Sequence, residues 1–510
     1  MRGDLPHALA RRRAGILLHP TSLPGKGGHG TLGKEALYLI DRLAACGISV
    51  WQMLPLGPTH DAPNGLGSPY QCLSSHAGNP ELICLDSLRQ LGWLAGDASS
   101  LKEAYEGFKR HASPHDREAF STFVAREADW LEDFALFMAL REQQGRKAWF
   151  DWPAQLRDRH PSAMQQMRAA LRERIDGVRF EQFVFALQWQ ALKAYAHVRG
   201  VLLFGDMPIY VAHDSAEVWA RPELFSVDAE GRAEEVAGVP PDYFSETGQR
   251  WGNPLYRWER HVEEGFAWWK ARFATHLRLF DLVRIDHFRG LESYWSIPAA
   301  CETAIDGHWV KAPGDELLSA LCEAFGPLPV VAEDLGIITE EVTELRQKHH
   351  LPGMRILQFA FDGGPDNPYL PHNHTLDSVV YTGTHDNDTT LGWWSSLNEE
   401  ARQQVHDYLG ESSEPMPMLL MRVALESVAN LVILPLQDVL GLGSDARMNT
   451  PGTPEGNWHW RFEWSQWSEE ASARLAHEVA LYGRKAESRA SSMPSPQEAG
   501  GAAVALASRA

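Results

Sequence analysis

Short apolar runs that end in polar or glycine-containing loops recur along the chain. Runs of this length between turn residues are typical of buried parallel strands. Segments with helical periodicity, such as 268–279, 314–325 and 339–349, precede several of them. This alternation predicts an α/β protein built on a (β/α)8 TIM barrel over residues 14–484, with its active face at the C-terminal ends of the strands. The predicted strands are 14–19, 48–56, 201–206, 282–285, 329–334, 354–361, 378–383 and 431–436.

Two intervals between predicted strands are too long for plain barrel units. Residues 72–198 contain several helical patterns and predict an inserted, mostly helical subdomain; these patterns fall at 101–109, 118–144, 163–175 and 181–198. Residues 211–264 are rich in Gly, Pro, Trp and Asp and predict an irregular insertion that acts as an active-site lid. Both insertions leave from the C-terminal ends of strands, so we expect both over the active face. Residues 485–510 lack apolar periodicity and predict a disordered tail.

Charge, hydropathy and cysteine content limit which partners and which cellular location the sequence predicts. The chain carries 47 Lys and Arg against 67 Asp and Glu, a net charge of −20, which argues against nucleic acid or an anionic membrane. No stretch approaches the ~20 apolar residues of a membrane span. The apolar run after Arg11-Arg12-Arg13 is too short for a signal peptide. The five scattered cysteines indicate reduced thiols and therefore a cytoplasmic location.

A charged pair lies at the C-terminal end of the fourth predicted strand, which is expected at the mouth of the barrel. Side chains alternate along a strand, so Arg284 and Asp286 point the same way, about 7 Å apart along its axis. At that distance the guanidinium can keep the Asp286 carboxylate ionised and lower its pKa. The pair is either catalytic, as charged groups at this end of a barrel strand often are, or a salt bridge that only holds the loop.

Two further carboxylates follow strands and should meet Asp286 at the same face. Glu333 ends the strand 329–334, and Asp386 follows the strand 378–383. Burial at the mouth of an apolar strand raises a carboxyl pKa, which suits Glu333 to general acid catalysis. Two carboxyl groups with divergent pKa values indicate chemistry on a glycosidic bond. Each acid taken alone could instead cap a helix or form a loop salt bridge.

Other chemistries find little support in the sequence. The segment His385-Asp386-Asn387-Asp388 resembles a metal site, but its spacing lacks the glycine and glutamate of a calcium loop. The sequence contains no His-Glu-x-x-His zinc motif, no Gly-x-Ser-x-Gly serine motif and no phosphate-binding loop. We therefore expect neither a metal nor a cofactor.

Three of these segments carry a resemblance to a known family. Arg284-Ile285-Asp286-His287-Phe288-Arg289-Gly290, Ala332-Glu333-Asp334-Leu335-Gly336 and Thr384-His385-Asp386-Asn387 resemble the fourth-, fifth- and seventh-strand motifs of 4-α-glucanotransferases. That family, the amylomaltases or disproportionating enzymes, is glycoside hydrolase family 77 of the α-amylase superfamily. Gly205 to Tyr210, Ser68 to Gln71 and Pro240 to Pro254 resemble its third-strand motif, an early sugar-binding loop and its active-site lid.

The resemblance implies an enzyme that transfers a segment of an α-1,4-glucan to the 4-OH of another glucan or of glucose by a retaining double displacement. It makes Asp286 the nucleophile, Glu333 the acid/base and Asp386 the transition-state stabiliser. It implies glucan metabolism with maltooligosaccharides as partners, and a monomer or a homodimer. The implied substrate-binding residues are Arg284, His385, Tyr70, Ser68, Asp206, Asp242, Gln249 and Trp251.

Two other functions use the same residues. An α-glucan hydrolase would have the same carboxylates in a site that admits more water. A glycan-binding protein without catalysis would have no need of three charged groups at strand ends, which argues against it. The loop from Arg447 to Trp458 is either an acceptor-side wall or a plain connection.

Overall fold

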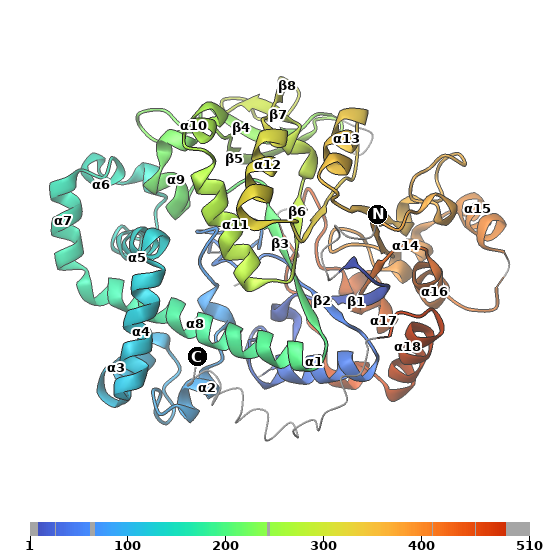
Figure 1. Ribbon diagram of the computed structural model, residues 1–510, viewed down its shortest axis with the longest axis horizontal. Coiled ribbons are helices and arrows are strands. Elements are labelled where there is room, and N and C mark those ends of the chain that lie inside the picture. Colours follow the sequence, from blue (N-terminus) through green and yellow to red (C-terminus); the bar gives the residue numbers. More distant parts are fainter. Residues whose placement is uncertain are drawn as a thin grey trace.

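A computed structural model describes residues 9–25, 27–61, 67–241, 245–410, 412–453 and 455–485. At its centre is a parallel eight-stranded sheet that curls into a barrel, in the order β10-β11-β12-β1-β2-β3-β6-β9 (Figure 1). Each predicted strand is confirmed. The strands are β1 (Arg13–Leu17), β2 (Val50–Gln52), β3 (Leu202–Pro208), β6 (Leu282–Asp286), β9 (Val330–Ala332), β10 (Gly353–Ile356), β11 (Ser378–Tyr381) and β12 (Leu431–Pro435).

Alternation along these strands divides the core into an inside and an outside. One buried cluster takes a residue from every strand of the barrel: Leu17, Val50, Phe204, Leu282, Val331, Met354, Val379 and Leu431. Their neighbours in sequence, among them Ile16, Trp51, Leu203 and Val283, pack in the larger outer cluster. Because both faces of the sheet are apolar, polar side chains gather where the strands end.

Helices cover the outside of the barrel (Figure 1). Three of them match the predicted helical segments 268–279, 314–325 and 339–349 closely, and the segment 314–325 matches without change. The helices on the outside are α1 (Lys34–Ala45), α11 (Ala267–Leu279), α12 (Gly314–Phe325), α13 (Glu340–Lys348), α14 (Thr390–Ser396), α15 (Glu399–Leu409), α16 (Met418–Glu426), α17 (Leu436–Val439) and α18 (Glu469–Leu481). Within the described ranges no helix is long and apolar enough to cross a membrane.

The first insertion is helical and forms the lobe at the left of Figure 1. The predicted single helix over 118–144 is two helices, because the chain turns at Glu127, where φ is −95° and ψ is 7°. Glu127 is 3% exposed and accepts a hydrogen bond from Trp130. The helices are α2 (Leu85–Gln90), α3 (Leu101–His111), α4 (Pro114–Arg126), α5 (Ala128–Gln143), α6 (Ala154–Arg157), α7 (Pro161–Ala170) and α8 (Arg172–Val198).

The second insertion, 211–264, is more regular than the sequence suggests. It contains α9 (Ala216–Ala220), β4 (Glu235–Val239), β5 (Gln249–Pro254) and α10 (Trp258–Glu263). Strands β4 and β5 pair antiparallel, and β4 also pairs with β7 (Ser293–Pro298), which pairs with β8 (His308–Lys311). This sheet was not predicted, because its two halves lie on either side of β6 in the sequence. The predicted disordered tail, apart from Lys485, falls outside the described residues.

Candidate active site

Arg284 lies at the centre of a buried network of charges at the barrel mouth. Strands β3 and β6 pair in a register that sets Asp206 beside Arg284. Nη1 of Arg284 donates to both carboxylate oxygens of Asp206, at 3.0 and 2.8 Å, and Nη2 lies 2.8 Å from Oδ1 of Asp286. Asp206 is 1% exposed and Arg284 is 4% exposed. The predicted pairing of Arg284 with Asp286 is therefore confirmed.

The predicted direction of the Asp286 pKa is wrong. Burial raises the pKa of Asp286 to about 8, although Arg284 acts to lower it. The carboxylates of Asp206, Glu333 and Asp386 raise it further. The physical reason is that Arg284 does not pair with Asp286 alone, because Asp206 binds the same guanidinium. One cation serves several acids, and it cannot offset the loss of water around Asp286.

Glu333 follows β9 and is held by backbone amides. Oε2 accepts a hydrogen bond of 2.6 Å from the N–H of His287, and Oε1 accepts one of 3.0 Å from Leu335. His287 directly follows Asp286, so one peptide unit joins the two carboxyl groups across neighbouring strands. Burial raises the pKa of Glu333, against the lowering effect of Arg284 and the two amides. This is the direction that the sequence predicts.

Asp386 lies in the loop after β11 and remains open to solvent. Its side chain is 44% exposed, and Nε2 of His385 is 3.4 Å from Oδ2. Asn449 donates a hydrogen bond of 2.6 Å to Oδ1, and Arg447 donates one of the same length to the backbone oxygen of Asp386. The sequence places Asn449 in the candidate acceptor-side loop but does not predict its contact with Asp386, because no motif connects residues 63 positions apart.

Tyr70 connects the early loop to the charged network. Its hydroxyl donates to Oδ2 of Asp206 at 2.7 Å, and its ring stacks on that of His385 with centroids 5.2 Å apart. Burial lowers the pKa of His385, which is therefore neutral near pH 7. Ser68 accepts a hydrogen bond from the backbone N–H of Tyr70, so it shapes the turn rather than reaching the carboxylates.

Two of the predicted lid residues lie on β5. Trp251 donates from Nε1 to Oε1 of Gln249 at 3.1 Å. Its ring meets the His287 ring edge to face at 4.8 Å, so the strand reaches the loop that follows Asp286. Gln249 and Trp251 are thus brought next to the network. Asp242 lies outside the described residues.

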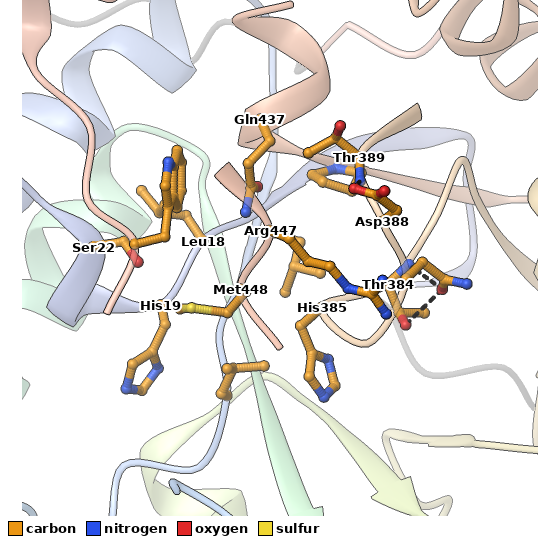
Figure 2. Close-up of a pocket in the computed structure, with 15 residues that line it drawn as sticks. Leu18, His19, Ser22, Thr384, His385, Asp388, Thr389, Gln437, Arg447 and Met448 are labelled. Atoms are coloured by element: carbon orange, nitrogen blue, oxygen red, sulfur yellow. Dashed lines mark hydrogen bonds between the residues drawn. The ribbon is translucent and has the colours of Figure 1, made fainter. Parts of the chain in front are cut away.

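A pocket lies beside Asp386, and Figure 2 shows the residues that line it. Arg447 extends toward the loop that carries Thr384, while the rings of His19 and His385 project to the same side of the pocket. Burial, with a smaller contribution from His385, lowers the pKa of His19 to about 3. Both imidazoles are therefore neutral near pH 7 and can hydrogen-bond to hydroxyl groups.

A groove of about 560 Å³ lies between the first insertion and the barrel loops. Trp458 lines it, and the Trp458 ring centroid is 5.9 Å from that of Tyr70, so the groove adjoins the site. Its walls include Met138, Arg141 and Arg174 from the helices of the insertion. Within the described part of the chain, no group of three or more His, Cys, Asp or Glu side chains could hold a metal ion.

Comparison with known proteins connects this geometry to one family. The family model described as 4-alpha-glucanotransferase matches residues 18–466. A 4-alpha-glucanotransferase of Thermus thermophilus is 52% identical over 92% of this chain and 98% of its own length. One of Synechocystis sp. is 48% identical over 94% of this chain and 99% of its own length. An amylomaltase from Streptococcus agalactiae, solved in complex with acarbose, matches with a TM-score of 0.89 at 37% identity, covering 93% of this chain and all of that one.

Proposed function

The chain belongs to the 4-alpha-glucanotransferase family, and on that premise we propose how its residues transfer a glucan segment. The enzyme moves a segment of an α-1,4-glucan to the 4-OH of an acceptor glucan or glucose through a covalent glucosyl-enzyme. In our proposal Asp286 is the nucleophile, Glu333 is the acid/base and Asp386 stabilises the transition state. The bond from the His287 N–H to Glu333 carries this assignment, because it ties the two reacting carboxyl groups together.

The first step breaks the glycosidic bond. Asp286 attacks the anomeric carbon while Glu333 gives its proton to the leaving 4-oxygen, so the donor loses its reducing-end segment. Retaining enzymes need two carboxyl groups about 5–5.5 Å apart for this step. Asp286 must be ionised, and the hydroxyl groups of a bound sugar would favour that form by donating hydrogen bonds to it.

The second step reverses the first with a new acceptor. Glu333, now ionised, takes the proton of the acceptor 4-OH as that oxygen attacks the anomeric carbon. The bond to Asp286 breaks and the carboxylate is restored. A water molecule in the acceptor position would give hydrolysis instead, so transfer requires an acceptor that is held better than water.

The remaining predicted residues would place the sugar. The side chain of Asp386 remains 44% exposed although Asn449 holds its Oδ1, which suits it to accept hydrogen bonds from the ring hydroxyls in the transition state. We propose that Arg284, Asp206 and His385 lie beneath the bound sugar and contact it. We propose Tyr70 and Trp251 as aromatic contacts, with Ser68, Asp242 and Gln249 as polar ones.

The groove beside Trp458 extends the site beyond the reacting sugar. Its volume and polar lining suit a maltooligosaccharide chain, and we propose that the helical insertion 72–198 binds glucan units there while 211–264 closes over the reacting bond. We also propose a reducing, cytoplasmic location, which is consistent with the five cysteines being free in the structure.

Two substitutions test the central assignment. Glu333→Gln removes the proton donor, and Asp286→Asn removes the nucleophile, so each should lower kcat on maltotriose by about 10²- to 10⁴-fold. Glu340→Gln and Asp366→Asn, at exposed positions, are the matched controls and should retain wild-type activity. Activity above about a tenth of wild type in either test variant would overturn the assigned role.

A further inference from the structure

The barrel has a seam between β9 and β10. The two strands are at opposite ends of the strand order, and no ladder pairs them in the described part of the chain. A backbone hydrogen bond of 2.9 Å from Ala332 to Pro352 joins them. In a regular parallel ladder the next N–H, that of Met354, would bond to a carbonyl of β9. It donates instead to the side-chain oxygen Oδ1 of Asp334, at 2.7 Å.

Asp334 is enclosed by the elements that meet at this seam. Its side chain is 6% exposed, and Oδ2 lies 3.3 Å from both Nε of Arg346 and Nη1 of Arg355. A Cβ at Gly353 would lie 2.2 Å from the same oxygen, so only glycine leaves room for the carboxylate there. Arg346 comes from α13 and Arg355 from β10. The side chain is therefore held by a helix and a strand at once.

The same residue adjoins the proposed acid/base. Asp334 lies between Glu333 and Leu335, and the Leu335 N–H donates to Oε1 of Glu333. Asp334 ties residues 333–335 to β10, while the His287 N–H ties Glu333 to the end of β6. Without the first of these connections, the carboxyl group would be anchored on one side of the seam only.

We propose that Asp334 is a positioning residue for Glu333: its carboxylate closes the β9–β10 seam and fixes the segment that presents the catalytic acid. The inference rests on the role of Glu333 proposed above. Asp334 touches no substrate in this scheme and acts through Glu333 alone. Its charge has a second effect, because a buried anion beside Glu333 favours the protonated acid.

The electrostatic surroundings of Glu333 agree with that effect. Burial is the largest influence raising the pKa of Glu333, and Asp334 raises it as well, while Arg284 lowers it. Removing the negative charge of Asp334 should therefore lower the pKa of Glu333 and shift the alkaline limb of activity to lower pH. The charged or titratable groups that face Glu333 and Asp334 are Arg284 and Asp286 from β6, Arg346 from α13, Arg355 from β10, and Tyr369.

The test compares two substrates in the variant Asp334→Asn. Maltotriose needs a proton on its leaving oxygen, whereas α-maltotriosyl fluoride releases fluoride without one. We expect kcat/KM for maltotriose to fall about tenfold, with its alkaline limb at lower pH, while kcat/KM for the fluoride stays near wild type. An equal loss with both substrates, or an unmoved limb, would overturn the inference.

Asp281→Asn is the matched control. Asp281 accepts a hydrogen bond of 2.8 Å from the Leu203 N–H and pairs with Lys193 and His197, but it lies at the other end of the barrel, before β6. It should lower the melting temperature without moving the pH profile. If Asp334→Asn does not fold, Arg355→Gln replaces it: with one partner of Asp334 removed, kcat/KM should fall for maltotriose but not for the fluoride, and an equal effect on both substrates would refute the inference.

Glu333→Gln, measured alongside, separates this inference from the proposed function. If Glu333→Gln retains activity on maltotriose, the proposed function itself fails. If Glu333→Gln is inactive on maltotriose and Asp334→Asn behaves like Asp281→Asn, only the role of Asp334 fails.

Discussion

The side-chain amide of Asn449 lies 2.6 Å from Oδ1 of Asp386 and is the donor of a hydrogen bond to it. The loop that carries Asn449 also holds the Asp386 backbone through Arg447, and it reaches Tyr70 through the Trp458 ring. One loop therefore contacts both Asp386, the proposed stabiliser, and Tyr70, the proposed aromatic contact of the sugar. Because Asp386 is 44% exposed, Asn449 restricts a carboxylate that would otherwise be mobile.

Asn449→Ala should lower kcat more than it raises KM. A hydrogen bond to a charged group contributes about 1.5–3 kcal/mol, so losing the one that orients Asp386 corresponds to roughly a 10- to 100-fold loss. Steady-state kinetics with maltotriose measure both constants. Asn449→Asp sets two carboxylates side by side and should be worse still, with partial recovery at low pH. An unchanged kcat in both variants would show that Asp386 is positioned without Asn449.

Tyr70→Phe should distinguish the contribution of the Tyr70 hydroxyl from that of its ring. The substitution removes the 2.7 Å hydrogen bond to Asp206 but keeps the ring against His385. We expect the free energy of unfolding to fall by about 1.5 kcal/mol, and KM for maltotriose to change little. Denaturant unfolding and kinetics measure the two effects. Tyr105→Phe, on α3, is the control and should lose less stability; an equal loss in both would contradict the contribution of the Asp206 bond.

Asp286→Asn should change how stability depends on pH. The folded pKa of Asp286, about 8, lies above the ordinary value of 3.8, so folding takes up a proton between these pH values. Wild-type stability then falls as pH rises through that window, and this contribution is absent in the variant. The melting temperature of the variant relative to wild type should therefore increase from pH 4 to pH 8. A constant difference across this range would show that the Asp286 pKa is not raised.

Trp251→Ala should shift the reaction from transfer toward hydrolysis. The wild-type enzyme should convert maltotriose into glucose and longer maltooligosaccharides while total reducing ends stay nearly constant. Removing a ring beside His287 opens the site to water, so the number of reducing ends should rise. Product sizing together with a reducing-end assay distinguishes the two outcomes. Reducing ends that rise with substrate loss in the wild type, without longer products, would indicate a hydrolase.

Sequence patterns predict the barrel well because each strand is a local feature. Apolar runs with polar ends mark the eight strands, and alternation along β6 predicts that Arg284 and Asp286 share a side. The order of the motifs also brings Glu333 and Asp386 to the same face of the barrel.

Features that depend on contacts between residues far apart in the sequence cannot be predicted from local sequence patterns. Burial is the main cause of the raised pKa of Asp286, and Asp206, 80 positions earlier, raises it further while it holds the same guanidinium. The hydrogen bond from Asn449 to Asp386 and the pairing of β4 with β7 likewise join segments that no local pattern connects. The turn at Glu127 depends on a buried carboxylate that looks like an ordinary helix residue in the sequence.

The small antiparallel sheet links the segments on both sides of β6. Strand β4 lies before Asp286 in the sequence and β7 after it, and eight residues of the two strands face one another in register, from Glu235 opposite Pro298 to Gly238 opposite Trp295. The two segments therefore form one structural unit. An insertion or deletion in 235–254 would shift its partners in 293–311, so viable variants should change both segments together, and grafting one segment from a relative without the other should fail.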